Sequence, residues 1–243
     1  CMSLLTGHQL GCRLNNQWVL RSLQMSVQSG ERIAVVGANG SGKTTLLRLI
    51  HGLQTPHEGQ LIWSHPVRKT MLFQRLHMMR CRVRHQVALS LWLHAGASWK
   101  GSLWRECQDR ALALLNQAGL NELSDQPAHT LSTGQRQILA FALALAGYPD
   151  VLLLDEPTAN LDPHAKKEME LRIETACRSA QSNTPLTLIF SSHNLGQVKR
   201  LATRVWYLER GRLCADLKTE QFFNADLSDS HPEAHFFLKV ERA

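Results

Sequence analysis

One glycine-rich stretch, residues 37–44, constrains the fold of this chain more than any other. Its letters, GANGSGKT, match the phosphate-loop pattern G-x-x-x-x-G-K-[ST] at every fixed position. A short, largely β-branched run, 33–36, precedes it, and an apolar stripe at helical spacing, 45–50, follows it. In a strand, loop and helix of this kind, backbone N–H groups surround phosphate oxygens. The stretch therefore predicts an α/β protein with a phosphate site, against the alternative of a glycine-rich turn that binds nothing.

The residue types of this loop indicate how a nucleotide would be held. Glycines allow the backbone to approach the phosphates closely and to take φ angles that other residues resist. Lys43 offers a positive charge to the β- and γ-phosphates, and Thr44 offers a hydroxyl to Mg²⁺. The candidate phosphate-contacting residues are Gly37, Ala38, Asn39, Gly40, Ser41, Gly42, Lys43, Thr44 and Thr45.

Strands are predicted on both sides of the loop in the sequence. Residues 3–29 alternate apolar and polar side chains in places, which is typical of an antiparallel β layer. Short apolar runs typical of buried strands recur later, and a hairpin is predicted around Gly211. The further strand candidates are residues 33–36, 60–63, 70–73, 151–154, 186–190, 205–208 and 212–214.

Residues 80–147 change character, because their apolar residues recur at helical spacing. This predicts a helical subdomain inserted into the α/β protein, with helices over 83–94 and 103–118. Trp92, Trp99 and Trp104 lie in it, and they form either the core of the subdomain or an exposed docking patch. The expected division is one domain over residues 1–243, with an α/β core from 1–79 and 148–215, a helical subdomain at 80–147 and a polar C-terminal tail at 216–243.

Composition narrows the classes of partner. A chain of 243 residues with 44% hydrophobic content can bury one sizeable core. Its net charge of +7 suits polyphosphate or an anionic membrane surface as the partner. The sequence has no run of basic residues interleaved with aromatic ones, so nucleic acid is not favoured as a partner. The six cysteines occur singly, which indicates neither a zinc site nor a disulfide framework. The sequence has no signal-like start and no apolar run near the ~18 residues of a membrane span, so we expect a cytosolic chain.

Two acids after a buried strand narrow the chemistry. The phosphate loop alone would allow a kinase, a GTPase or an ATPase. Asp155, at the end of the strand candidate, is placed to hold a magnesium shell, and Glu156 beside it can polarise an attacking water. Adjacent ionised carboxylates repel each other unless a cation is near, so a bound Mg²⁺ would stabilise this pair.

Several motifs in this order resemble those of the nucleotide-binding subunit of ABC transporters. The order and spacing match from about residue 4 to residue 214, and the resemblance implies a RecA-like P-loop NTPase core with an antiparallel β layer and a helical subdomain. The stretch LSTGQ resembles the ABC signature, although the spacing of Ser132 and Gln135 also has a purely structural interpretation as a helix capping box. The matched segments are residues 37–44 (Walker A), Gln74 (Q-loop), 131–135 (signature), 151–156 (Walker B), 159–162 (D-loop) and His193 (switch histidine).

The resemblance implies a site that binds and hydrolyses Mg-ATP. In it, Lys43 holds the phosphates, Glu156 is the general base, His193 contacts the γ-phosphate and Gln74 senses that phosphate. The implied metal residues are Thr44, Gln74 and Asp155. The resemblance also implies a head-to-tail dimer with two ATP molecules at its interface, in which a second copy contributes Ser132, Thr133, Gly134 and Gln135.

Some positions depart from the pattern of the family. Thr133 stands where the family usually has glycine, and Ile138 and Leu143 stand in a region where arginine is common. The aromatic residue that usually packs on adenine is expected near Leu14, and Trp18 is the nearest aromatic candidate. Trp18 is therefore either a nucleotide contact or an inward-packing strand residue, which is the commoner case.

The resemblance further implies partners in transport. A subunit of this kind drives a separate membrane permease from the cytoplasmic face of the membrane, and an extracytoplasmic binding protein would deliver the substrate. Residues 76–84 mix methionine with arginine, which suits an adaptable interface. They predict that a permease helix docks between the Gln74 region and the helical insertion, with a solvated basic loop as the alternative.

Three segments are most similar to the ATPases of tungstate and molybdate importers, which predicts a small oxyanion as cargo. Import of phosphate or amino acids is an alternative. Outside transport, the alternatives are a soluble ABC ATPase for cluster assembly or repair, and a nucleotide-dependent scaffold, which the presence of Glu156 disfavours. The three segments are residues 73–80, residues 191–202, and the tail around 222–224 and 237–238.

Overall fold

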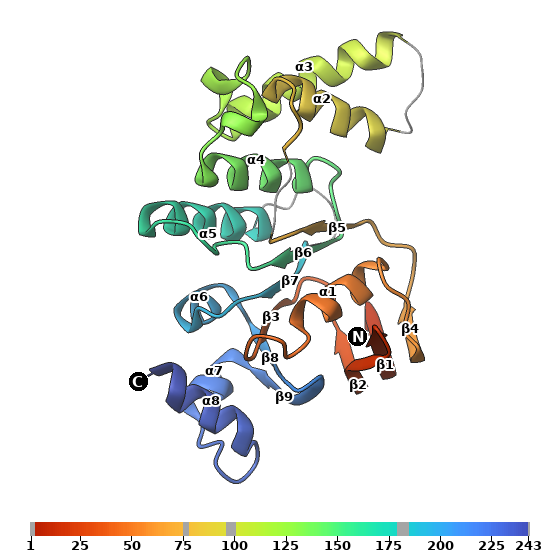
Figure 1. The fold of residues 1–243 in the computed structure, drawn as a ribbon, viewed down its shortest axis with the longest axis vertical. Helices are drawn as coiled ribbons and strands as arrows, with labels where there is room; N and C mark the ends of the chain where they lie inside the picture. Colours follow the sequence, from red (N-terminus) through yellow and green to blue (C-terminus); the bar gives the residue numbers. More distant parts are fainter. Residues whose placement is uncertain (1–2, 75–77, 96–100, 179–184, 243) are drawn as a thin grey trace.

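A six-stranded sheet forms the centre of the molecule (Figure 1), whose computed structural model describes residues 3–74, 78–95, 101–178 and 185–242. The strand order is β5-β6-β7-β3-β8-β9, and every neighbouring pair is parallel except the β8–β9 hairpin. The middle strands are buried on both faces, which explains their continuous apolar sequence. The strands are β3 (Arg32–Val36), β5 (Lys69–Leu72), β6 (Val151–Asp155), β7 (Thr187–Ser191), β8 (Arg204–Glu209) and β9 (Arg212–Lys218).

A smaller antiparallel sheet and helix α1 (Lys43–His51) cover one face of the central sheet. The smaller sheet has the order β2-β1-β4, which confirms the β layer predicted over residues 3–29. Its inward side chains share a hydrophobic cluster with α1 and with one face of the central strands, where Trp206 is fully buried. The strands are β1 (Leu5–Leu14), β2 (Gln17–Val27) and β4 (Glu58–Trp63).

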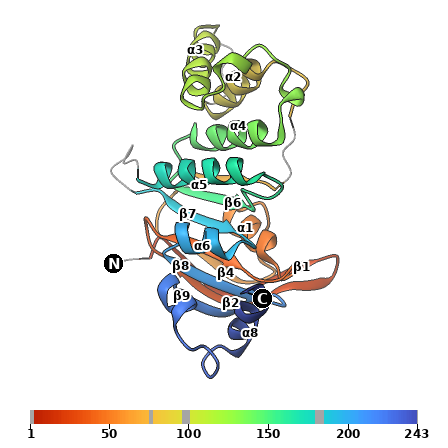
Figure 2. The same ribbon diagram turned by 90° about the vertical axis from the view of Figure 1, so that its left-hand side faces the viewer.

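Helices α5 (Pro163–Arg178) and α6 (Leu195–Leu201) lie across the opposite face of the central sheet (Figure 2). Met169 and Val198 from these helices pack in one cluster with Phe190 of β7. Helix α5 begins after Asp162, whose side chain accepts hydrogen bonds from the backbone N–H groups of His164 and Ala165, at 2.9 and 3.0 Å.

The C-terminal segment is not a loose polar tail. Strand β9 continues to Lys218, and α7 (Thr219–Asn224) and α8 (Pro232–Arg242) follow it. Phe222 is fully buried, and the ring of Phe237 lies 5.1 Å from that of Tyr207. The segment therefore completes the same hydrophobic cluster as α5 and α6, and its two apolar groups are the reason that it folds onto the core.

The helical subdomain has a hydrophobic core of its own above the central sheet (Figure 1). The rings of Trp92 and Trp104 meet edge to face with centroids 6.4 Å apart, and both pack against this core, so the core interpretation holds for these two. Trp99 lies outside the described residues. The helices are α2 (Val83–His94), α3 (Gly101–Gln117), the short 3₁₀ turns η1 (Asn121–Leu123) and η2 (Ala128–Thr130), and α4 (Thr133–Leu145).

Candidate active site

The phosphate loop runs from the end of β3 to the first turn of α1, as predicted. Gly37, Gly40 and Gly42 have φ angles of 146°, 78° and 106°, which L side chains rarely adopt. A Cβ atom on Gly37 would lie 2.1 Å from the carbonyl oxygen of Leu208, and one on Gly42 would lie 2.7 Å from a methyl group of Leu20. Glycine is therefore required at these two positions by both conformation and space.

Polar groups inside the loop are poised for an anion. The Lys43 ammonium is buried and donates hydrogen bonds to the carbonyl oxygens of Gly37 and Ala38, at 2.8 and 3.1 Å. The Ser41 hydroxyl is also buried, and it has no hydrogen-bond partner among the described residues. A buried hydroxyl without a partner is costly unless a ligand completes it, so the loop fits a bound phosphate group.

Asp155 lies at the end of β6 within reach of the loop. The Thr44 hydroxyl donates to Asp155 Oδ2 at 2.9 Å and to Oδ1 at 3.1 Å. The Ser191 hydroxyl donates to Asp155 Oδ1 at 2.7 Å. The structure therefore brings together two of the three residues predicted to hold a metal, Thr44 and Asp155, and it adds Ser191 beside them, which the sequence did not indicate.

Three strand ends converge on Glu156. The Gln74 amide, after β5, donates to Glu156 Oε2 at 2.9 Å. His193, after β7, places Nε2 2.6 Å from Glu156 Oε1. Because β5, β6 and β7 are adjacent and parallel, their carboxyl ends meet at one edge of the sheet, where ligands bind in α/β proteins. Gln74 and His193, which carry no signal singly, thus join the acid pair.

The signature-like stretch forms the N-terminus of α4. The Ser132 hydroxyl accepts the N–H of Gln135 at 3.2 Å, and the Gln135 side chain accepts the N–H of Ser132 at 2.9 Å. The capping box is thereby confirmed. Ser132 and Thr133 are exposed, Gly134 and Gln135 are half-buried, and all four belong to the helical layer rather than to the phosphate loop (Figure 1).

Trp18 packs within the β layer. It pairs across from Arg13 on β1, whose guanidinium lies 4.0 Å from the centre of the Trp18 ring. The edge of the ring lies beside Gly11, where a Cβ atom would be 2.9 Å away. Trp18 is half-buried and is not among the described residues that pack against the hydrophobic cluster of the β layer, so its inward-packing role and its contact with a nucleotide both stay predictions.

A second residue missed by the sequence ties the helical subdomain to the acid pair. The buried Gln137 side chain, on α4, donates to the carbonyl oxygen of Pro157 at 2.7 Å. A glutamine inside an otherwise apolar helix was the only signal that could have indicated it. The bond joins the helix that carries LSTGQ to the turn that follows Glu156.

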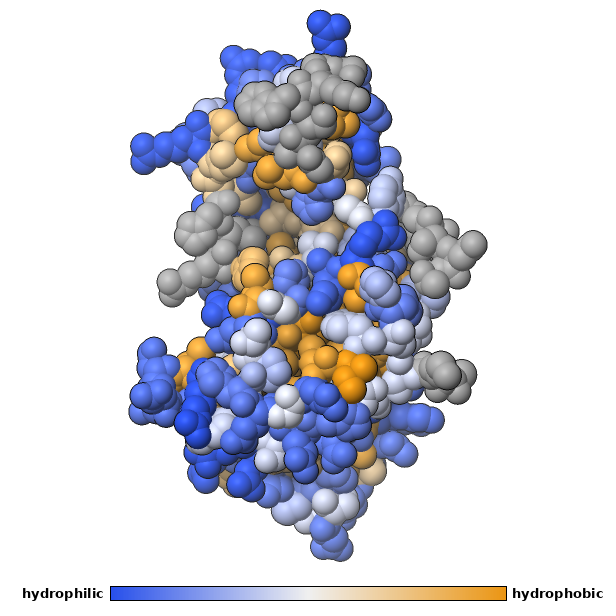
Figure 3. All heavy atoms as spheres, turned by 90° about the vertical axis from the view of Figure 1, so that its right-hand side faces the viewer, coloured by the Kyte–Doolittle hydropathy of each residue, from blue (hydrophilic) through white to orange (hydrophobic). Residues whose placement is uncertain are grey.

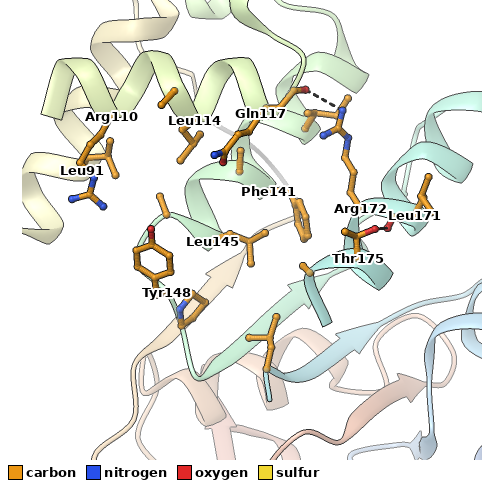
Figure 4. Close-up of a pocket in the computed structure, with 18 of the residues that line it drawn as sticks. Leu91, Arg110, Leu114, Gln117, Phe141, Leu145, Tyr148, Leu171, Arg172 and Thr175 are labelled. Carbon is orange, nitrogen blue, oxygen red and sulfur yellow. Dashed lines mark hydrogen bonds between the residues drawn. The ribbon is translucent and has the colours of Figure 1, made fainter. Parts of the chain in front are cut away.

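A groove of about 1060 Å³ separates the helical subdomain from the core, between α3, α4 and α5 (Figure 4). Its lining is largely apolar, with Leu114, Phe141 and Leu145 in the middle and Arg110 and Arg172 among the charged side chains that line it. None of residues 78–84 lines it. Figure 3 shows apolar surface extending from the helical subdomain down to the core on the right-hand side of the view in Figure 1.

The arginines predicted to dock a partner are partly engaged elsewhere. Arg82 and Arg84 both pair with Asp125, at 3.1 and 3.0 Å. Met78 packs against the core of the helical subdomain, and Met79 is exposed. Much of residues 78–84 therefore supports the fold of the subdomain, while residues 75–77 lie outside the described part of the chain.

Comparison with known proteins assigns the family. A family model described as ABC transporter matches residues 20–159, more than half of the chain. This chain belongs to the ABC transporter family. The matched range includes the phosphate loop, the helical subdomain and the acid pair.

Relatives of this ABC ATPase domain differ in cargo. The aliphatic sulfonates import ATP-binding protein SsuB 1 of Agrobacterium fabrum is 34% identical over 200 residues, which are 82% of this chain and 68% of that protein. The tungstate uptake system ATP-binding protein TupC of Peptoclostridium acidaminophilum is 34% identical over 201 residues, covering 80% and 89%. The arginine transport ATP-binding protein ArtM of Bacillus subtilis is 31% identical over 238 residues, covering 91% and 92%.

Solved structures confirm the fold class. An ATP-binding cassette solved as a dimer in a post-hydrolysis state with ADP and Pi matches with a TM-score of 0.76 at 22% identity, over 88% of this chain and 98% of that one. An ATP-binding cassette of another ABC transporter matches with a TM-score of 0.78 at 22% identity, over 98% and 99%. As an ABC ATPase domain, the chain binds and hydrolyses ATP.

Proposed function

We propose that this chain is the ATP-hydrolysing subunit of an importer that acts on a separate membrane permease. The observation that carries the proposal is the convergence of Gln74, Asp155, Glu156 and His193 beside the phosphate loop. The relatives are named for import or uptake of several substrates, which supports the importer reading. Among the described residues, no helix has the length and apolar character to cross a membrane, so in this proposal the chain is peripheral and binds the cytoplasmic face through the permease.

Each polar group at the site has a proposed role. Lys43 and the loop amides bind the β- and γ-phosphates, and Glu156 accepts the proton of the attacking water. His193 binds the γ-phosphate, and Gln74 reports its presence to the helical subdomain. The contacts of Gln74 and His193 with Glu156 support a shared role for the three side chains.

Mg²⁺ fits the donors present. The Thr44 hydroxyl and the Asp155 carboxylate are hard oxygen ligands 2.9 Å apart. Gln74, whose amide nitrogen bonds the adjacent Glu156, is the third proposed ligand through its amide oxygen. The described residues hold no cluster of three or more His, Cys, Asp or Glu side chains, which suits an ion held jointly with nucleotide phosphates. When bound, the ion supplies positive charge to the phosphate oxygens.

The active form in this proposal is a head-to-tail dimer. The phosphate loop and the signature-like stretch belong to different parts of one chain, so a second copy would bring Ser132, Thr133, Gly134 and Gln135 to the phosphates. One matching structure was solved as a dimer bound to ADP and Pi, and the proposal takes the same state for this chain. Thr133 adds a small hydroxyl where the family usually has glycine.

The groove between α3, α4 and α5 is the proposed docking site for the permease. Its largely apolar lining, with Arg110 and Arg172 among the charged side chains, suits an amphipathic helix laid into a groove. The sequence predicted the dock between the Gln74 region and the helical insertion, and this proposal moves it to the groove between α3, α4 and α5. The family pattern has arginine in the region of Ile138, and here Ile138 adds to the apolar lining.

For cargo, we propose a small oxyanion, with tungstate or molybdate favoured. The three sequence segments similar to such ATPases support this, and relatives named for sulfonate, phosphate, tungstate and sulfate fit it, while those named for arginine and nickel do not. The substrate would reach the permease from an extracytoplasmic binding protein.

The test reconstitutes this subunit with its permease and binding protein, then measures ATPase stimulation by tungstate, molybdate, sulfate, phosphate and arginine. The expected result is stimulation by tungstate or molybdate at the lowest concentration. Stimulation by arginine alone would refute the oxyanion and leave the importer standing. Full activity without any permease would refute the importer.

A further inference from the structure

Ser191 occupies a buried position between β3, which leads into the phosphate loop, and β6, which leads into the acid pair. It ends β7, where it pairs with Asp155 of β6 on one side and with Val35 of β3 on the other. It is 0% exposed, like the rest of β7. Serine is not favoured in strands, and burying its hydroxyl costs free energy unless hydrogen bonds complete it. Packing alone does not explain serine at this position.

The hydroxyl of Ser191 bridges two neighbouring residues with a fixed polarity. It accepts the backbone N–H of Glu156 at 3.0 Å, and it donates to Asp155 Oδ1 at 2.7 Å. A backbone N–H can only donate and an ionised carboxylate can only accept, so the hydroxyl proton must point to Asp155. One side chain thus holds the carboxylate of Asp155 and the main chain of Glu156 at once.

The backbone at Glu156 needs such support. Its φ angle is 48°, in the left-handed region that costs about 1–2 kcal/mol for a residue with a side chain. Its N–H group would lose its partner if the Ser191 hydroxyl were removed. The conformation of Glu156 decides where its carboxylate meets Gln74 and His193. Strained residues at functional sites persist only where surrounding contacts hold them.

We propose that Ser191 is a positioning residue for ATP hydrolysis, which fixes the orientation of Asp155 toward Thr44 and the main chain of Glu156. This rests on the proposed roles of Asp155 and Glu156. Among the described contacts Ser191 reaches the loop only through Asp155, whereas it bonds the main chain of Glu156 directly, so we expect its larger effect on the catalytic step. A misplacement of about 1 Å in such a group costs about a hundredfold in rate.

The test compares Ser191→Ala with Ser192→Ala, its neighbour. Ser192 is equally buried, but its hydroxyl bonds Gln197 and the N–H of Asn194 instead. For Ser191→Ala we expect kcat to fall about 10- to 100-fold while the KM for ATP stays within twofold. Ser192→Ala is expected to keep kcat within about threefold. NMR should show faster hydrogen exchange of the Glu156 amide in Ser191→Ala only.

Ser191→Cys adds a graded variant that preserves the volume. A thiol is a weaker donor and acceptor than a hydroxyl, so kcat of Ser191→Cys should lie between those of the wild type and Ser191→Ala. If the alanine variant does not fold, a lower kcat of Ser191→Cys than of the wild type, at unchanged KM for ATP, carries the test. The inference is overturned if kcat in Ser191→Ala stays within twofold, or if Ser192→Ala loses as much. Loss of turnover in Glu156→Gln alongside unchanged Ser191→Ala would refute the inference and leave the proposed function intact.

Discussion

Both carboxylate oxygens of Glu156 are occupied in this structure. Gln74 donates to Oε2, and His193 lies 2.6 Å from Oε1. Each carboxylate oxygen has two lone-pair sites, so an attacking water can still bond Glu156 while both contacts remain. Gln74 and His193 thus fix the orientation of the carboxylate and leave it able to take a proton.

Replacing Glu156 by glutamine keeps the shape of the side chain and removes the base. We expect Glu156→Gln to bind ATP as the wild type does and to lose at least about 100-fold in turnover. ATP trapped between two copies stabilises the dimer by mass action, so sedimentation in ATP should show a dimer. A monomer under these conditions, or retained hydrolysis, would contradict the assignment.

Lys43 is the second residue with a sharp expectation. Its ammonium already bonds two loop carbonyl groups, so it is oriented before phosphate arrives. Removing one charge-assisted contact of about 1.5–3 kcal/mol should weaken ATP binding about 10- to 100-fold in Lys43→Ala. Fluorescence titration with ATP measures this, and exposed Lys199→Ala on α6 is the matched control. Equal affinity of the two variants would exclude Lys43 from the site.

For individual residues, the sequence predicted part of the site from local patterns and the other part only through the family resemblance. Lys43 and Thr44 follow from the loop, and Asp155 and Glu156 from a strand that ends in acids. Gln74 and His193 lie far apart in the sequence, and nothing local says that β5 and β7 flank β6. The role of Ser191 could not be predicted, because a serine at a strand end is common.

Among the elements, α4 combines a structural and a proposed binding role in one residue. Ser132 caps the helix through the N–H of Gln135, and in the dimer it would also face the phosphates of the partner copy. The cap needs an oxygen that accepts a hydrogen bond, and the phosphate contact needs a hydroxyl that donates one, so alanine would remove both at once. A pair of variants that both cap the helix but differ in the charge of the side chain separates the two roles.

The variants Ser132→Asn and Ser132→Asp make this separation. Both residues are good N-caps, so the free energy of unfolding should change by less than about 0.5 kcal/mol in either. The added carboxylate in Ser132→Asp would repel phosphate across the interface and should abolish ATP-driven dimerisation, which Ser132→Asn should retain in part. Equal dimerisation of both variants, measured by light scattering, would place Ser132 outside the interface.

Elements with strong local patterns were predicted well and those that depend on distant packing were not. Helix α2 has the predicted bounds, because its apolar spacing continues for a dozen residues. Helix α7 has six residues, too few to show a period, and it is stabilised where Phe222 meets the core. The C-terminal segment was therefore expected only as a polar tail with two apolar clusters.

In the whole molecule, two hydrophobic clusters cover the faces of the central sheet and a third stabilises the helical subdomain. The polar contacts that cross between subdomain and core include Gln137 to the carbonyl oxygen of Pro157, and Arg172 on α5 to the carbonyl oxygen of Ala118, at 3.0 Å. Arg172 and Ala118, which form the second of these contacts, both line the groove. A partner seated there would touch both bodies at once.

Blocking the groove should uncouple transport without harming the ATPase site. Ala146 lines the groove and is half-buried, so Ala146→Glu places a charge there with little cost to the core. We expect the variant to lose co-purification with the permease and to keep its own ATP affinity within twofold. Leu53→Glu, at an exposed leucine beyond α1, is the control. Normal permease binding by Ala146→Glu would move the dock elsewhere.

The position of β3 in the sheet also sets the order in which the chain can fold. This strand carries the phosphate loop, and both of its neighbours, β7 and β8, come from residues 187–209. During synthesis, most of the chain must therefore leave the ribosome before β3 can pair with its neighbours and support the phosphate loop. Pairing between such distant segments is slow, because the entropy of closing a long loop is lost before the new contacts offset it. Until then, the apolar residues 33–36 remain unpaired, and ATP has nothing to bind.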